Sequence, residues 1–328
     1  MKKNKLFLFI VVISLLNVYS CSNNKNSNPT SPNTNPTNFN AQQLFSDTWS
    51  GELSAIAYDS TTNNLFYIRI DNSVPNEIRR YNFVTDQTSI VYTYQSQWDY
   101  GMRVLNGDLY IVRSYDNSIL RLTNLNSNTL TDVGTYPDNN GSNLLLREID
   151  DVTLLNDNLY FVCGNMLTSM QNNGIQYLQG PDFTTVHELL SSNNADWPDS
   201  SYGYYRSLLS IGSGVSAKFV ITTGPNGSIE LRDASGNLLT SEPGYGDSYL
   251  QKDSQSRIYA ITGSNVNTKI TRWSSNLDNK EEFTINFPEY NGGDGIRFIL
   301  KDAGNNIDVV MVQFRKSNPV FYKTTIPN

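Results

Sequence analysis

A strand pattern that recurs along the chain is the feature that most constrains its fold. The clearest copy spans Gly101–Tyr136, where turn residues separate short runs with strand character. Asn106-Gly107 predicts a tight hairpin between the first two runs, because both turn residues must adopt a positive φ. The expected strands of this copy cover residues 102–105, 109–112, 119–122 and 130–136.

The second strand of this unit has counterparts along the rest of the chain. The matching runs are 65–68, 109–112, 159–162, 219–221, 258–261 and 307–310. Third strands follow at 78–81, 119–122, 175–178, 229–231, 270–273 and 320–322. A period of roughly 42 to 56 residues is typical of propeller blades. The sequence therefore predicts an all-β fold, a six-bladed β-propeller with four-stranded antiparallel blades over residues 41–328.

The two ends of this region predict how the ring closes. The sixth unit offers three strands, near residues 296–300, 307–314 and 320–325, before the chain stops. Ala41–Asp47 has strand character and belongs to no unit of its own. We expect it to take the outer position of the sixth blade, because closure of the ring hides sheet edges.

The first residues predict a targeting signal. A basic start, Met1–Lys5, precedes the apolar run Leu6–Leu16, which suits a signal peptide over residues 1–20 and is too short to span a bilayer. Val18-Tyr19-Ser20-Cys21 resembles the lipobox of bacterial lipoproteins. That resemblance implies lipid on Cys21, and Ser22 favours the outer membrane of the cell envelope. A plain secreted protein is the alternative.

Composition limits the partners. Residues 21–40 are rich in Asn, Pro, Ser and Thr, so we expect a disordered tether after the lipidated Cys21. The formal net charge of −7 argues against nucleic acid as a partner, because an acidic surface repels phosphates. The membrane is then the expected partner of the lipid anchor, and the oligomeric state stays open.

The single histidine and the second cysteine carry no evident chemistry. His187 falls in an expected outer strand, away from a site for a catalytic triad, and one histidine rules out multi-histidine zinc or copper sites. Cys163 is expected to be a buried free thiol on a second strand. With Cys21 lipidated, the mature chain would hold no internal disulfide.

Charged and aromatic residues gather in the loops that enter each first strand. In a propeller these loops open onto one end of the central channel, so we expect a ligand there. Aromatic rings and paired polar groups suit a glycan, a peptide or a protein partner. The opposite interpretation is that Arg and Asp pair with each other and the rings pack between blades. The candidate binding residues are Trp98, Asp99, Tyr100, Arg103, Glu148, Asp150, Asp151, Tyr204, Tyr205, Arg206, Asp247, Tyr249, Asp294 and Arg297.

A metal is the alternative occupant of this channel mouth. Calcium-like ions take carboxylate and carbonyl oxygens, so axial carboxylates could hold one. No other cofactor is predicted. The carboxylates that could converge are Glu52, Asp99, Glu148, Asp150, Asp151, Asp247 and Asp294.

The repeat pattern over residues 41–328 resembles six-bladed propellers of the TolB-like and NHL-like group, in particular propeller lipoproteins of Bacteroidota. That group contains binding proteins, scaffolds and metal-dependent lactonases or lyases, so the resemblance does not select a function. The sequence favours a non-enzymatic binding module on the outer membrane. The alternatives are a hydrolase or lyase that uses a calcium-like ion and a scaffold within an envelope complex.

Overall fold

In the computed structural model, strands form almost all of the secondary structure described in the unit Pro36–Asn328. The expected signal peptide, the predicted lipidation site Cys21 and residues 21–37 of the predicted tether 21–40 lie outside the described residues. No helix in the described ranges is long and apolar enough to cross a membrane. The described residues are 38–49, 51–71, 74–95, 99–113, 118–136, 149–163, 174–191, 205–223, 227–246, 248–262, 268–288 and 295–328.

Four sheets consist of four consecutive antiparallel strands each. Blade 1 contains β3 (Glu52–Asp59), β4 (Asn64–Ile70), β5 (Asn76–Asn82) and β6 (Gln87–Tyr94). Blade 2 contains β7 (Asp99–Leu105), β8 (Asp108–Arg113), β9 (Ser118–Thr123) and β10 (Thr131–Tyr136). Blade 3 contains β11 (Ile149–Leu155), β12 (Asn158–Cys163), β13 (Gly174–Leu178) and β14 (Val186–Ser191). Blade 4 contains β15 (Tyr205–Ile211), β16 (Lys218–Thr223), β17 (Ser228–Asp233) and β18 (Leu238–Pro243), with a 3-10 turn, η2 (Gly214–Ser216), between the first two.

Blades 5 and 6 recruit strands from the start of the unit. Blade 5 contains β19 (Leu250–Lys252), β20 (Ile258–Thr262), β21 (Thr268–Trp273) and β22 (Glu281–Asn286), and β1 (Asn38–Asn40) adds to β22 in parallel. Blade 6 contains β23 (Ile296–Ala303), β24 (Asn306–Gln313) and β25 (Val320–Pro327), and β2 (Gln42–Ser46) pairs antiparallel with β25. The unit is therefore a six-bladed β-propeller, as predicted, and its sixth blade is completed by the expected N-terminal strand.

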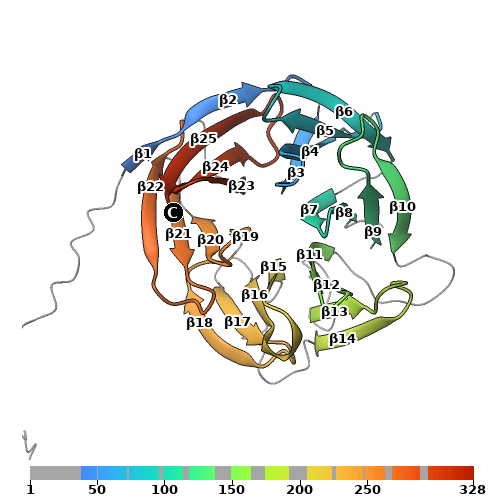
Figure 1. Ribbon diagram of the computed structural model, residues 1–328, viewed down its shortest axis with the longest axis vertical. Coiled ribbons are helices and arrows are strands. Elements are labelled where there is room, and N and C mark those ends of the chain that lie inside the picture. Colours follow the sequence, from blue (N-terminus) through green and yellow to red (C-terminus); the bar gives the residue numbers. More distant parts are fainter. Residues whose placement is uncertain are drawn as a thin grey trace, which may run out of the picture. The chain divides into compact units, whose positions relative to one another are not determined.

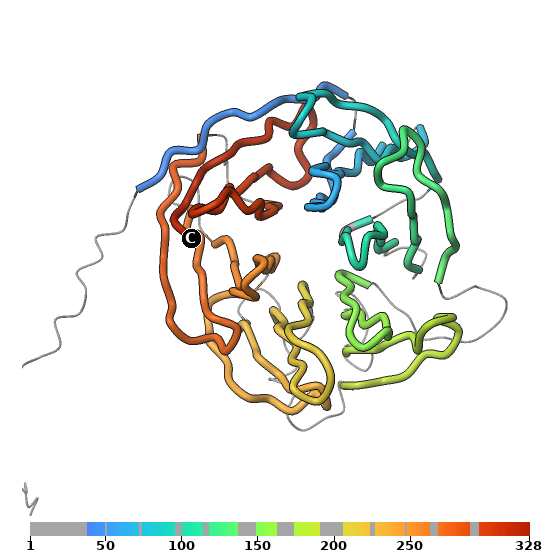
Figure 2. Tube along the Cα trace, viewed as in Figure 1, coloured from blue at the N-terminus to red at the C-terminus, as the bar shows by residue number. Residues whose placement is uncertain are grey.

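The first strand of every blade faces the centre of the ring. Figure 1 shows β3, β7, β11, β15, β19 and β23 around the central opening, with β6, β10, β14, β18 and β22 at the rim. In Figure 2 the blue N-terminal segment follows the outer edge beside the orange and red C-terminal blades. The order of strands within each sheet gives this arrangement, because each blade is a meander that runs outward from the axis.

Each pair of neighbouring blades shares a hydrophobic cluster. Phe66 of blade 1 packs with Leu109 of blade 2, and Phe161 of blade 3 packs with Val112 of blade 2. The ring closes in the same way, since Tyr67 of blade 1 and Phe321 of blade 6 share one cluster. Burying such a side chain fully contributes about 1.5–3 kcal/mol. Neighbouring blades cover both faces of each blade, which explains why the sequences of the second strands are continuous apolar runs.

The Asn106-Gly107 hairpin has the geometry that the sequence predicts. Asn106 has a φ of 51° and Gly107 a φ of 85°, so both residues lie in the left-handed region that a tight turn of this hand requires. The turn joins β7 to β8 with Leu105 opposite Asp108. It lies at the end of the channel opposite the loops that enter the first strands, because each strand crosses from one face to the other.

Candidate functional site

A β-bulge recurs at the start of three first strands, where they form the channel entrance. The register of β7 with β8 shifts between Asp99 and Gly101, that of β11 with β12 between Ile149 and Asp151, and that of β15 with β16 between Tyr205 and Ser207. The extra residue of each bulge is therefore Tyr100, Asp150 or Arg206. Bulges redirect side chains at the rims of sheets. Gly101, Asp151 and Ser207 then occupy equivalent positions next to the axis.

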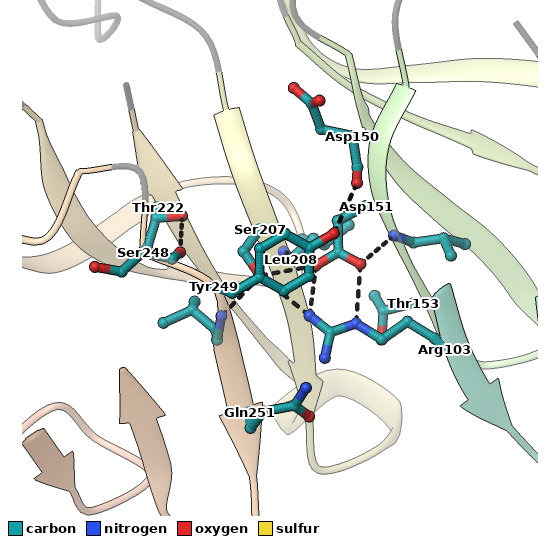
Figure 3. Close-up of polar contacts among 12 residues, drawn as sticks. Arg103, Asp150, Asp151, Thr153, Ser207, Leu208, Thr222, Ser248, Tyr249 and Gln251 are labelled. Atoms are coloured by element: carbon teal, nitrogen blue, oxygen red, sulfur yellow. Dashed lines mark hydrogen bonds and ion pairs between the residues drawn. The ribbon is translucent and has the colours of Figure 1, made fainter. Parts of the chain in front are cut away.

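Asp151 of blade 3 lies at the centre of a buried polar network (Figure 3). Its side chain is fully buried, and the Arg103 guanidinium of blade 2 donates to both carboxylate oxygens, Nε at 2.9 Å and an Nη at 2.5 Å. The Ser207 hydroxyl donates at 2.7 Å, and the backbone N–H groups of Val152 and Leu208 each donate at 2.9 Å. These five donors occupy the lone pairs of the carboxylate. Asp151 therefore joins three blades and is not available to ligate a metal.

Ser207 extends the network to a fourth blade. Its hydroxyl accepts from Arg103 at 3.1 Å and from the backbone N–H of Leu250, in blade 5, at 3.0 Å. With its own proton given to Asp151, this hydroxyl has used one donor and both acceptor positions. Ser207 is not among the residues predicted from the sequence. A serine at the start of a strand is not distinguishable by pattern from one that faces solvent.

The charge on Arg103 is stabilised in place. Burial acts to lower its pKa, but the charge and hydrogen bonds of Asp151 outweigh burial and raise the pKa of Arg103. The ring of Tyr249, from the loop before β19, lies 5.5 Å from the guanidinium carbon. Burial, with the negative charge of Asp151, raises the pKa of the Tyr249 phenol, so it remains a neutral donor. That phenol donates to the Asp150 carbonyl oxygen at 3.3 Å.

Arg206 and Arg297 complete the entrance cluster. Arg206 of blade 4 lies 3.8 Å from the Asp150 carboxylate and is partly exposed. Arg297 of blade 6 is buried and places its guanidinium carbon 3.9 Å from the Tyr249 ring centroid and 4.1 Å from the Phe314 ring centroid. Residues from five blades therefore meet at the channel entrance, and we call Arg103, Asp150, Asp151, Arg206, Ser207, Tyr249 and Arg297 the entrance cluster.

The structure places other candidate residues outside this cluster. The buried Asp99 carboxylate accepts from Tyr94 at 2.6 Å and from Asn76 at 3.1 Å, so it joins blades 1 and 2. Tyr100 and Tyr205 lie on β7 and β15, and their side chains are not among those described. Trp98, Glu148, Tyr204, Asp247 and Asp294 lie outside the described residues.

A cavity of about 530 Å³ follows the axis beyond the entrance cluster. All six first strands line it, and the lining continues to Asn106 and Ser254 in the hairpins on the opposite face. Arg103 lines it as well, so the cavity reaches the entrance cluster. Lys252 projects among these residues and donates to the Ser210 carbonyl oxygen at 2.5 Å. Burial in the cavity lowers the pKa of the Lys252 amine, and the charge of Arg103 lowers it further.

The described residues do not assemble a metal-binding group. Within the described ranges, no three side chains of His, Cys, Asp or Glu lie close enough to share an ion. Asp99 and Asp151 each face donors rather than another carboxylate. A calcium ion at the mouth therefore stays a prediction that depends on Glu148, Asp247 and Asp294.

His187 lies on the outer strand β14, as predicted, where it stacks on Tyr177 with ring centroids 4.9 Å apart. Gln179 lies within hydrogen-bonding distance of it, at 3.1 Å. Cys163 ends β12, the predicted second strand, and its side chain is not described.

Comparisons with known proteins identify the fold alone. The chain matches no protein-family profile and no curated protein sequence. Among solved structures it is similar to a gluconolactonase from Xanthomonas campestris, with 10% identity, 88% of this chain and 90% of that chain covered, and a TM-score of 0.57. It is also similar to a chain in the crystal structure of a nidogen/laminin complex, with 12% identity, coverage of 70% and 79%, and a TM-score of 0.50. At these identities the likeness shows a shared propeller architecture.

Proposed function

We propose that this protein is a lipid-anchored propeller of the bacterial envelope that binds a ligand at its channel entrance without transforming it. The observation that carries this proposal is the convergence of charged and aromatic residues from five blades in the entrance cluster. A rigid cluster at the mouth of a polar channel gives a ligand fixed donors and an aromatic wall.

The hydrogen bonding of the cluster supports binding over catalysis. Five donors hold the Asp151 carboxylate, and the Ser207 hydroxyl has no free position for a proton from a substrate. A general base needs a free lone pair to accept a proton from the substrate, and a nucleophile needs one to attack it. These two side chains therefore support the blades, and a bound molecule would contact the arginines and Tyr249.

The support for a lipid anchor comes from the sequence. The lipobox-like Val18–Cys21 and the polar segment after it favour attachment through Cys21 to the outer membrane. We expect the full-length chain to partition into detergent and to carry lipid. Mass spectrometry of the N-terminal peptide checks this, and an unmodified Cys21 would refute the anchor while leaving the binding proposal untouched.

The ligand is tested by screening the full-length chain on glycan, peptide and envelope-protein arrays. We expect a signal that falls when Trp98, Tyr204 and Arg206 are replaced together by alanine. The matched control is His187→Ala, which removes a polar ring from the outer strand β14. An unchanged signal in the triple variant would refute binding at the entrance.

Metal analysis separates this proposal from a metal-dependent hydrolase or lyase. Binding by the entrance cluster requires no ion, so the melting temperature is expected to be the same before and after chelation. Bound calcium together with a fall in melting temperature on chelation would favour the enzymatic alternative.

A further inference from the structure

Arg297 differs from the other buried arginines of the described chain. It is 7% exposed, yet among the described residues no hydrogen bond or ion pair reaches its guanidinium, and its buried Nε has no acceptor. Arg103 and Arg232 are at least as buried, and each holds a carboxylate, Asp151 and Glu230 respectively. A buried charge without a partner is costly, so its retention at a channel entrance requires an explanation.

Among the residues that the structure describes, the charges around Arg297 leave one cation in excess. Asp151 is paired with Arg103, and Asp150 lies against Arg206. Burial lowers the pKa of Arg297, and the charge of Arg206 lowers it further, while Tyr249, Asp151 and Asp150 act in the opposite direction. An anion placed beside the guanidinium would offset both the burial and the repulsion.

The aromatic neighbours fix the direction from which an anion can approach. The Tyr249 and Phe314 rings lie 3.9 Å and 4.1 Å from the guanidinium carbon, with the cation over each ring. At such short distances a guanidinium typically stacks on a ring through the faces of its plane. The N–H edge is left for a coplanar partner, and a carboxylate can accept two parallel hydrogen bonds there.

We propose that Arg297 binds the carboxylate of a small acidic ligand at the channel entrance, with Tyr249 and Phe314 holding the guanidinium in place. This inference rests on the proposed binding function and names its ligand class. The formal net charge of −7 favours a monoanion over a polyanion, because the field of the whole protein opposes accumulated negative charge.

The test is calorimetric titration of the full-length chain at constant ionic strength with glucuronate, galacturonate, lactate and succinate. Glucose and galactose are the neutral counterparts of the two uronates. We expect saturable binding of at least one of the four carboxylates. For a uronate that binds, we expect the affinity for its neutral sugar to be weaker by roughly tenfold or more, the usual effect of losing a charged hydrogen bond. Failure of all four carboxylates would overturn the inference.

Substitutions of Arg297 test whether this residue binds the carboxylate. Arg297→Gln should remove carboxylate binding, and Arg297→Lys should restore part of it through charge alone. The melting temperature of Arg297→Gln should equal or exceed that of the unsubstituted chain, because removing a buried charge that has no carboxylate beside it offsets the loss of the contacts with Tyr249 and Phe314. Arg80→Gln, which removes a guanidinium that bonds to the exposed Ser127 carbonyl oxygen, is the matched control and should bind normally.

Three further outcomes are distinguishable. If sulfate or phosphate binds as tightly and with the same dependence on Arg297, the choice of a carboxylate is wrong. If a neutral ligand from the arrays depends on Arg206 and not on Arg297, the proposed function stands and this inference fails. If carboxylates bind only through Arg297 but no array ligand depends on the entrance, the inference stands and the screened ligand classes are excluded.

Discussion

At the scale of single residues, Asp151 is the side chain on which the centre of the ring most depends. It links blades 2, 3 and 4 through Arg103 and Ser207. Asp151→Asn should lower the free energy of unfolding by about 3–5 kcal/mol, because Arg103 would keep a buried charge without its partner. Urea denaturation measures this.

An exposed ion pair is the control, because it shows how much of the effect at Asp151 comes from burial of the pair. Asp108→Asn disrupts the more exposed pair with Arg121 and should cost about 1 kcal/mol or less. Replacing Arg103 and Asp151 together by Met and Leu should recover part of the loss, since it removes the unpaired charge but leaves the Ser207 hydroxyl and two backbone N–H groups without their acceptor. Equal losses at Asp108 and Asp151 would contradict the importance given to the buried pair.

Gly101 is required by a close approach of two blades. A methyl group there would lie 2.5 Å from the Asp150 carbonyl oxygen and 3.3 Å from the Tyr249 hydroxyl. Gly101→Ala should therefore lower the free energy of unfolding by about 1–3 kcal/mol. In an unstrained strand the same change would raise the free energy of unfolding by about 0.4–1 kcal/mol. The sign of the measured difference therefore shows whether the close approach at Gly101 excludes a methyl group.

Tyr259 gives a pH dependence that can be isolated. Burial and the Asp253 carboxylate, which accepts from the phenol at 2.9 Å, raise its pKa to about 12, although Arg272 acts in the opposite direction. Since the unfolded value is 10.0, the folded state retains its proton to higher pH. The stabilisation is complete below pH 10 and is lost as the pH rises toward about 12.

Comparing Tyr259→Phe with the unsubstituted chain measures the pH-dependent stabilisation that comes from the raised pKa of Tyr259. The variant should show a smaller fall in the free energy of unfolding across that alkaline interval, as followed by denaturation at each pH. Identical pH profiles for the two chains would contradict the assigned shift.

At the scale of elements, the N-terminal strands fasten the ring across two blades. Phe45 of β2 stacks on Phe321 of blade 6 and Tyr81 of blade 1, with ring centroids 4.2 Å and 4.0 Å apart. Asp47, just after β2, accepts from Arg79 and Tyr67 of blade 1. This closure therefore combines backbone pairing, ring stacking and an ion pair.

Phe45→Ala should lower the free energy of unfolding by about 2–3 kcal/mol, below the usual range for a fully buried phenylalanine because Phe45 is half-buried. Gln43→Ala, at an exposed position of the same strand, should stay within about 0.5 kcal/mol. Thermal unfolding of both variants provides the comparison. Comparable effects would show that β2 contributes backbone pairing and little else.

At the scale of the whole molecule, the fold could be predicted because its signal repeats. The apolar second strands, such as 109–112 and 159–162, recur with turns between them, and both faces of each are buried between blades. The convergence of Arg103, Asp150 and Arg297 could also be predicted, since the starts of all first strands meet near the axis.

Other features of the fold and the site could not be predicted, because they depend on contacts between residues far apart in the sequence. Strand β1 is three residues long, Asn38–Asn40, and pairs in parallel with β22, so it lacks both length and alternation. Phe314 contacts Arg297 only because blade 6 brings the end of β24 beside the start of β23. The axial cavity needs the packing of all six first strands before its lining can be identified.

A crystal structure of the full-length chain with the tightest-binding carboxylate from the titrations tests the role of Arg297 directly. We expect a carboxylate in the plane of the Arg297 guanidinium, within hydrogen-bonding distance, with Tyr249 and Phe314 stacked as they are here. An ion pair between Arg297 and a carboxylate of the protein itself, with the probe bound elsewhere, would contradict it.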